Sequence, residues 1–224
     1  MGTLYFSPPD KLNDPFDCNI NVKQSILNAA KELTGINAAK LNDLAEDNKL
    51  FDKLNTDINE LGVCAFSLDL LNTIMWSHYA NDHKGVSILY DFPESFITDE
   101  CNKLLGVATV NYEPDSLMNW FKCIANQIPD ELNFEDFVIK LAQRIVTVKS
   151  PAWKDENEVR ILRTEIGTLK IPRSFIKQIC FGLRTPKQDI ELVSKITEGF
   201  KHKVQLCKIE KSVDSDFSIY ANEI

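Results

Sequence analysis

Two long stretches of the chain carry apolar residues at helical spacing. The first runs from residue 41 to 61 (Leu41, Leu44, Phe51, Leu54, Ile58 and Leu61) and the second from 134 to 148 (Phe134, Phe137, Val138, Leu141, Ile145 and Val148). Spacings of three, four and seven place such residues on one helix face. We predict one helix that ends at Gly62, an earlier helix before it, and a longer helix from about Asn133 to Val148.

Shorter apolar and β-branched runs predict strands at 63–66, 86–92, 105–112, 158–164, 175–183 and 204–209. Further helices are predicted at 68–80, with Ser67 as N-cap, at 93–103, at 115–126, and after Thr185-Pro186, where a hydroxyl precedes proline. The first twenty residues are rich in turn formers. Strands scattered among unequal helices predict a single α+β domain over residues 1–224, with a mixed or antiparallel sheet of short strands and helices packed around it.

Composition narrows the class of protein. No uninterrupted apolar run reaches the roughly eighteen residues of a membrane span, and the N-terminus lacks a signal-peptide core, so we expect no membrane contact and a cytoplasmic location. The six cysteines are scattered without a CxxC pair or a cysteine–histidine cluster. Reduced thiols and no metal site are therefore expected.

Charge is unevenly distributed. The formal net charge is −8, yet residues 170–211 hold ten Lys or Arg against four Asp or Glu, a local +6 that leaves −14 for the rest. A solvated surface is one interpretation of this stretch, and a patch that attracts a phosphate-bearing ligand is the other. Within it, Arg184 lies between a predicted strand and a helix start, where free N–H groups favour phosphate. The negative net charge of the whole chain argues against non-specific binding to duplex nucleic acid.

Three short blocks carry the candidate chemistry. In the block 7–17, Asn13-Asp14-Pro15-Phe16 predicts a rigid turn with Phe16 buried, and its polar groups, with Ser7, could wall a pocket. The block 75–85 holds Trp76 and Tyr79, natural walls for a planar ring, and two histidines five apart, which is a weak metal pair.

The third block, 149–160, contains Glu156, Glu158 and Arg160. On a strand, residues two apart project to the same side. These three side chains either form an exposed acid–base edge or line a pocket, and Trp153 just upstream favours the pocket. We predict that they share one cavity with Ser7 and with the second block.

The motifs at 4–17 (LYFSPPDKLNDPFD), 64–67 (CAFS), 75–92 (MWSHYANDHKGVSILYDF), 148–162 (VKSPAWKDENEVRIL) and 171–182 (IPRSFIKQICFG) occur in this order. Together they closely resemble the prokaryotic family catalogued as domain of unknown function 2971, from about Tyr5 to Gly182. The family's name implies no activity.

The layout also resembles that of NAD-dependent ADP-ribosyltransferases, including those that modify DNA. An early Ser-containing turn, an aromatic-rich helix after a strand and a Glu-x-Glu before a late strand are shared features. That resemblance implies a split sheet, Glu158 as the catalytic acid, Glu156 orienting the acceptor, and Tyr79 or Trp76 stacking the nicotinamide. His78 is a further candidate catalytic residue, and Ser7, Asn13, Arg160 and Arg184 are candidate cofactor contacts.

The chain departs from both patterns at its start. Members of the unknown-function family begin with a strand that carries a basic or aromatic pair, followed by a short helix, before the Ser-Pro turn. Transferases place an Arg or His on their first strand to hold NAD. This chain reaches the turn at Ser7. We therefore expect that first strand, and its NAD-anchoring residue, to be missing.

Three functions remain open at this point. The first is a transferase-like enzyme acting on NAD, such as a toxin or phage-defence effector. The second is a catalytically silent module that senses a nucleotide or nucleic acid through the basic stretch 170–211. The third is a metal-dependent hydrolase or nuclease that uses His78, His83 and nearby acids.

Overall fold

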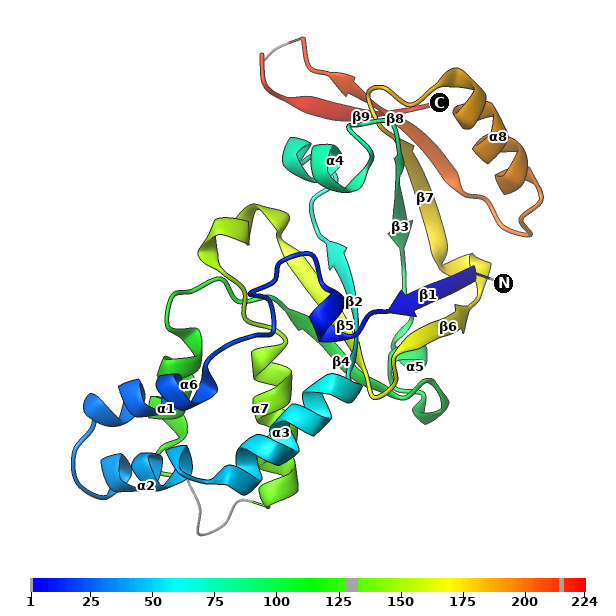
Figure 1. Cartoon of the computed structure of the whole chain (residues 1–224). Helices are drawn as coiled ribbons and strands as arrows, with labels where there is room; N and C mark the ends of the chain where they lie inside the picture. The colour runs from blue at the N-terminus through cyan, green and yellow to red at the C-terminus, as the bar shows by residue number, and fades with distance from the viewer. Residues whose placement is uncertain (1, 128–132, 214–215) are drawn as a thin grey trace.

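Small β-sheets form the framework of the fold. The computed structural model describes residues 2–127, 133–213 and 216–224 (Figure 1). In this part of the chain, one sheet pairs β1 (Gly2–Phe6) with β6 (Gly167–Ile171), and a second has the order β2 (Gly62–Ser67), β5 (Glu158–Arg163), β4 (Leu104–Thr109). The third has the order β3 (Val86–Tyr90), β7 (Ile176–Phe181), β8 (Gln205–Lys211), β9 (Ile219–Glu223). All pairs are antiparallel except β7–β8, so the predicted α+β class is confirmed.

A bundle of helices covers one end of the sheet β2-β5-β4, at the lower left of Figure 1. It contains α1 (Val22–Lys31), α2 (Gly35–Ala45), α3 (Asn48–Glu60), α6 (Ser116–Ile124) and α7 (Phe134–Ile145). Buried residues such as Leu54, Phe121 and Leu141 pack there with Val63 and Leu162 of the sheet. These two residues are cross-strand partners, so one face of the sheet is fixed against the bundle.

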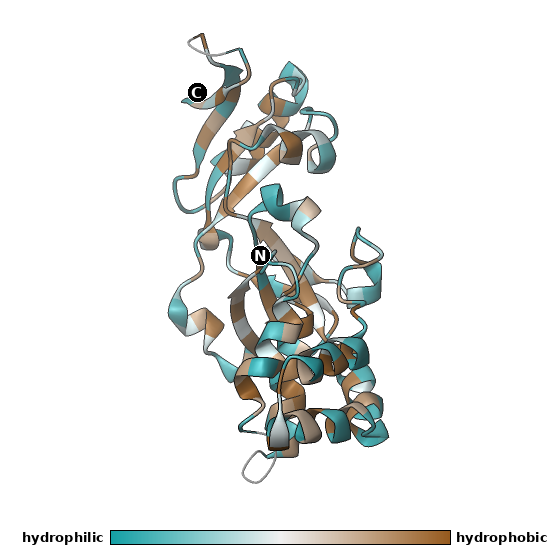
Figure 2. Cartoon of the chain, turned by 90° about the vertical axis from the view of Figure 1, so that its left-hand side faces the viewer, coloured by the Kyte–Doolittle hydropathy of each residue, from teal (hydrophilic) through white to brown (hydrophobic). Residues whose placement is uncertain are grey.

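The third sheet is covered on both faces. Trp76 of α4 (Thr73–Tyr79) packs against Cys180, Cys207 and Ile209, and α8 (Lys187–Glu198) packs on the other side, against Ile179 and Phe181. Figure 2 shows hydrophobic residues along the strands and on the inward sides of the helices. The remaining elements are α5 (Glu94–Ile97) and the short 3-10 helices η1 (Pro9–Lys11), η2 (Glu100–Asn102), η3 (Pro151–Glu156) and η4 (Arg173–Phe175).

The apolar stripe at 41–61 spans two helices, not one. The first ends at Ala45 with Glu46 as its C-cap, and Asp47 caps the second, because its side-chain oxygen accepts hydrogen bonds from the N–H groups of Lys49 and Leu50 at 2.9 and 3.2 Å. Gly62 does not cap α3 but begins β2. A Cβ atom there would lie 2.4 Å from the Glu165 carbonyl oxygen and 2.7 Å from the Phe6 Cβ, so glycine allows a close backbone approach.

Two predicted helix starts are wrong. The helix after β2 begins at Thr73 rather than Leu68, and its cap is Asn72, not Ser67. Thr185 does not cap α8, because its hydroxyl donates to the Gly85 carbonyl at 2.9 Å and Pro186 occupies the N-cap position. In both places a short polar side chain is used for a tertiary hydrogen bond, which local sequence does not reveal.

The expectation of a turn-rich start is wrong for residues 2–6, which form β1. Neither β6 nor β9 was predicted. β1 and β6 stabilise each other by pairing from Gly2↔Ile171 to Phe6↔Gly167, and β9 pairs with β8 from Cys207↔Glu223 to Lys211↔Ile219. These short strands depend on their partners rather than on a strong pattern of their own.

Candidate functional site

A cluster of buried charged side chains lies where β5 leaves the helical bundle. Its centre is Arg160, which is 0% exposed. The guanidinium donates to Asp17 through Nη1 and Nη2 at 3.0 and 2.5 Å, and to Glu158 through Nε and Nη2 at 2.6 and 3.1 Å. A further bond from Nη1 to the Val146 carbonyl at 2.7 Å ties the cluster to the end of α7. Every nitrogen of the guanidinium therefore has an acceptor.

Lys149 is the second cation of the cluster. Its ammonium donates to Glu156 and, at 3.1 Å, to Glu158, and it lies 3.7 Å from Asp17. Burial by itself lowers the pKa of Lys149, but the hydrogen bond to Glu156 and the charge of Glu158 outweigh it and raise the pKa well above its usual value. Lys149 is therefore charged at neutral pH.

Glu156 connects this cluster to α4. The Tyr79 hydroxyl donates to Glu156 Oε1 at 2.6 Å, while Lys149 donates to Oε2. Burial, followed by this hydrogen bond, raises the pKa of Tyr79. The backbone of Glu156 is fixed as well, since the Ser67 hydroxyl donates to its carbonyl at 2.8 Å.

The local sequence explains how two glutamates two residues apart converge. Glu156 is the last residue of η3, so the strand alternation used to predict its direction does not apply to it, and Asn157 adopts a left-handed conformation with φ of 44° before β5 begins. Glu158 and Arg160 then project to one face of β5, as predicted. The alternative of an exposed edge is wrong, because β5 lies between β2 and β4 and both side chains are buried.

One cavity of about 410 Å³, which we call the charged cavity, lies against the cluster. Six of the predicted site residues line it: Ser7, Asn13, Tyr79, Glu156, Glu158 and Arg160. Its other walls include Asp17, Lys149, Tyr5, Phe66 and Met75. The structure thus brings the Ser-Pro turn, α4 and the Glu-x-Glu segment to a single hollow, and the roles predicted for these residues stay predictions.

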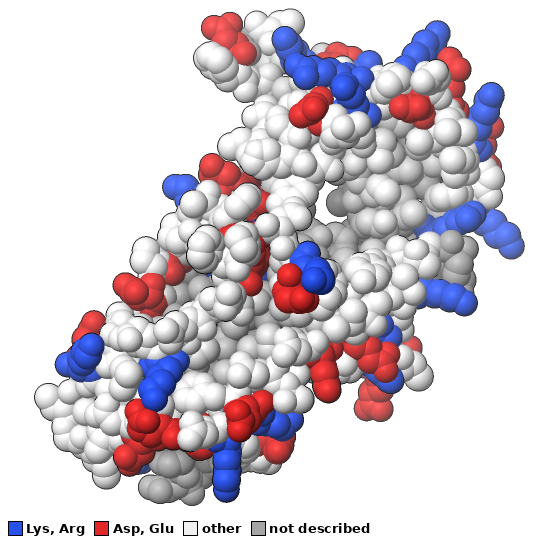
Figure 3. All heavy atoms as spheres, in the orientation of Figure 1, with Lys and Arg blue, Asp and Glu red and all other residues white. Residues whose placement is uncertain are grey.

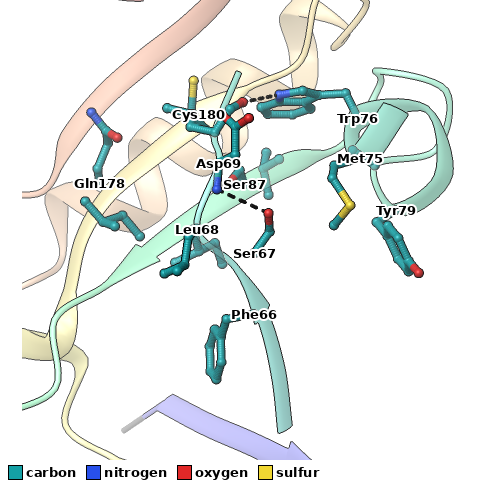
Figure 4. Close-up of a pocket in the computed structure, with 15 residues that line it drawn as sticks. Phe66, Ser67, Leu68, Asp69, Met75, Trp76, Tyr79, Ser87, Gln178 and Cys180 are labelled. Carbon is teal, nitrogen blue, oxygen red and sulfur yellow. Dashed lines mark hydrogen bonds between the residues drawn. The ribbon is translucent and has the colours of Figure 1, made fainter. Parts of the chain in front are cut away.

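A second cavity of about 240 Å³ adjoins the first and is mostly apolar. Phe66, Ser67, Met75 and Tyr79 line both cavities. Figure 4 shows this second cavity, with Phe66, Ser67 and Leu68 following β2 and with Met75 and Tyr79 across from them.

Three predicted site residues do not reach the charged cavity. Trp76 is only 3% exposed, donates from its indole to the Leu70 carbonyl at 2.7 Å, and lines the second cavity instead. His78 is exposed, lines neither cavity, and has a ring contact with Tyr79 at 6.3 Å between centroids. Arg184 lies in the loop before α8, where its N–H donates to the His83 carbonyl. Phosphate binding at Arg184 stays a prediction.

The Asn-Asp-Pro turn forms, but Phe16 is not buried. The Asp14 carboxylate accepts the Phe16 N–H at 3.0 Å, as expected of such a turn. Phe16 itself is 76% exposed, because this turn carries its neighbour Asp17, rather than the aromatic ring, into the interior.

Sequence reasoning missed Asp17 and Lys149. Both lie inside the motifs discussed above, but neither has a partner within helix or strand spacing, so only the tertiary fold shows that they pair with Arg160 and Glu156. A signal was present in the local acid count: Glu156 and Glu158 on a buried element require cations, and Lys149 is the nearest one upstream on an apolar segment.

The cysteines and possible metal ligands can be placed as well. All six cysteines are free. Cys18, beside the Arg160 guanidinium, has its pKa raised to about 12 by burial and by Asp17. Among the described residues, no group of three or more His, Cys, Asp or Glu side chains is arranged to hold a metal ion, so the hydrolase alternative gains no support. Within the same residues no helix is both long and apolar enough to cross a membrane.

The fold and site define an α+β protein with a buried charge cluster at the wall of a two-part cavity. Comparison with protein families agrees with the sequence resemblance: residues 75–161 match the family described as "Protein of unknown function (DUF2971)". The matched segment runs from α4 to β5 and includes Tyr79, Lys149, Glu156, Glu158 and Arg160. Searches of curated proteins and of solved structures found no match.

Proposed function

We propose that the charged cavity is the active site of an enzyme that breaks the nicotinamide–ribose bond of NAD and transfers the ADP-ribosyl group to an acceptor. One observation carries the proposal: three buried carboxylates, Asp17, Glu156 and Glu158, face two buried cations, Lys149 and Arg160, while the exposed Lys11 at the cavity wall pairs with Asp10. The formal charge of the cluster is thus −1. A fixed excess of negative charge at a cavity wall stabilises a reaction in which positive charge develops.

The reaction fits that electrostatic arrangement. The bond between the ribose carbon and the nicotinamide nitrogen breaks, its electron pair leaves with nicotinamide, and positive charge builds on the ribose. The acceptor then forms a bond to the same carbon and releases a proton. Glu158, held by Arg160 and Lys149, is the carboxylate that lowers this barrier, and Glu156 orients the acceptor. Tyr79, 47% exposed at the cavity wall, supplies a ring surface for the nicotinamide.

The test is nicotinamide release by the purified chain, with and without DNA, RNA, protein or lysate as acceptor. Glu158→Gln keeps the shape of the side chain and loses its charge, so it should lower turnover by about 10²-fold or more while NAD still raises the melting temperature. Glu156→Gln should reduce transfer to the acceptor more than it reduces release of free nicotinamide.

Glu165→Gln is the matched control, since Glu165 lies just beyond β5, is 44% exposed at its side chain and pairs with Lys103 and Arg163 away from the cavity. Its turnover should equal that of the parent chain. If the parent releases no nicotinamide under any condition, the enzymatic proposal fails.

A second candidate is a module that binds a nucleotide without turning it over. The favouring observation is that the carboxylates already have partners: Glu158 accepts from Arg160 at both oxygens, and Glu156 accepts from Tyr79 and Lys149. A thermal shift by NAD or ADP-ribose without nicotinamide release identifies this function.

Nucleic acid is the other ligand of such a module. Figure 3 shows basic side chains over the lobe formed by β7, β8 and α8, with acidic ones between them. Binding there should weaken steeply with added salt, because each phosphate contact releases counterions. Filter binding of labelled DNA and RNA at two salt concentrations measures it.

A further inference from the structure

The two cavities form one cleft that follows a continuous segment of the chain. Residues 63–67 line the charged cavity, and residues 66–70 line the apolar one. Met75 and Tyr79 of α4 face this segment from the opposite side (Figure 4). A ligand that fills both halves therefore lies alongside β2 and its extension.

β2 presents an unused backbone edge to the cleft. On the side away from β5, Val63 exchanges two backbone hydrogen bonds with Ser7, at 2.8 and 2.9 Å. Alternate residues of a strand face the same neighbour, so Ala65 and Ser67 direct their N–H and C=O groups to this same edge. The arrangement of β5 agrees: Glu158, opposite Ser67, turns its carbonyl to Val110 beyond β4, not to β2.

The chain does not complete this edge. In the antiparallel bridge between Ser7 and Val63, the residue that would come opposite Ala65 is Tyr5, but β1 pairs there with β6, through Tyr5 and Thr168, and not with β2. Within the described residues, β2 pairs only with β5 and with Ser7. Ala65 lines the charged cavity and is exposed, so its free donor and acceptor are open to a ligand.

We propose that the cleft binds an extended peptide, which adds as a strand to the free edge of β2 at Ala65 and Ser67. Ser7 already pairs on this edge, so its geometry suits a peptide backbone. The extended part of this edge runs from Ala65 to Ser67, where β2 ends, about 7 Å at roughly 3.3 Å per residue, and residues 68–70 continue the wall of the cleft beyond it.

The residues that line the cleft indicate which side chains of a bound peptide it would accept. In the apolar half, Leu68 and Leu89 are 61% and 55% exposed and can cover an apolar side chain of the peptide. Asp69 lies in this half, and the buried charge cluster of the other half has a formal charge of −1, while Lys11 at the wall pairs with the exposed Asp10, so basic residues fit the rest. The partner is therefore a flexible segment in which apolar and basic residues alternate. This inference goes beyond the proposed function and does not rest on it.

The experiment uses fluorescein-labelled seven-residue peptides in which Lys alternates with Val, Leu or Phe, titrated with the full chain by fluorescence polarisation. Saturable binding is expected. Ala65→Pro removes the free N–H, which an edge strand tolerates, and should weaken binding by about tenfold. N-methylation of alternate peptide amides should weaken it similarly, because it removes donors from the peptide itself.

Thr109→Pro is the matched control, because Thr109 lies on the outer edge of β4, opposite Val159 and away from the cleft. Its affinity for the peptides should match that of the parent chain, and melting temperatures check that both proline variants fold. The proposal is overturned if no probe peptide binds saturably, or if Ala65→Pro and N-methylation leave affinity unchanged. It is also overturned if Ala65→Pro abolishes the NAD thermal shift while peptides bind as before, since the edge would then serve a nucleotide.

Discussion

Replacing Arg160 with methionine tests whether the charge cluster is held as the structure describes. Methionine retains the apolar stem but removes the guanidinium, five of whose hydrogen bonds satisfy Asp17, Glu158 and the Val146 carbonyl. Two carboxylates, each 6% exposed, would then lack their principal partner. Breaking a buried pair in this way costs about 3–5 kcal/mol, because it leaves uncompensated charge in the interior.

That cost converts to an observable change in melting temperature. For a chain of this size each kcal/mol corresponds to roughly 2–4 °C, so Arg160→Met should melt about 6–20 °C below the parent at pH 7. Thermal unfolding followed by circular dichroism at pH 7 measures this change.

Arg163→Met supplies the comparison on the same strand. Arg163 bonds the Asn102 carbonyl and Glu165, whose side chain is 44% exposed and can return to water. Loss of the Arg163 guanidinium should therefore lower the free energy of unfolding clearly less than loss of the Arg160 guanidinium, by about 1–2 kcal/mol. Equal destabilisation by the two substitutions, or a loss below about 1 kcal/mol for Arg160→Met, would refute the description of Arg160 as the centre of a desolvated cluster.

Three further predictions concern packing. Gly62→Ala should destabilise the chain by about 1–3 kcal/mol in urea unfolding, because the new Cβ meets a backbone oxygen; a neutral result would contradict the close approach. Phe16→Ala should change stability by less than about 0.5 kcal/mol, whereas Phe121→Ala, at 0% exposure, should cost about 3–5 kcal/mol. Iodoacetamide should modify exposed Cys101 well before Cys180, whose pKa burial raises to about 12; equal rates by mass spectrometry would contradict the burial.

The sequence supports the prediction of elements best where a single face is apolar over several turns. The stripe at 134–148 becomes α7, and the β-rich run after Gly85 becomes β3. The stripe at 41–61 has the right residues but the wrong connectivity, because Asp47 caps a new helix without disturbing the apolar spacing. Apolar periodicity indicates which residues are buried, whereas the break between these two helices depends on the hydrogen bonds that one side chain, Asp47, accepts.

The candidate site, like the fold, could be predicted from the sequence only in part. Glu158 and Arg160 could be placed on one side of a strand because strand geometry alone requires it. Their burial could not be predicted, since it depends on β2 and β4 pairing on either side of β5. Trp76 was assigned to the site for its chemistry, yet its ring packs on the third sheet because α4 lies across that sheet. An aromatic residue in a motif is a core residue as readily as a ligand contact.

The cavity owes its existence to small residues opposite large charged ones. Cross-strand partners project to the same face, and β2 places Ala65 opposite Arg160 and Ser67 opposite Glu158. Further along this face Val63 opposes Leu162, and there the helices fill the space. Where the partners become alanine and serine, no side chain from β2 covers the charges, and the backbone edge at Ala65 is uncovered too. A larger residue at 65 would fill the cavity beside Arg160, so the size of the cavity depends on the same residue whose backbone forms the free edge.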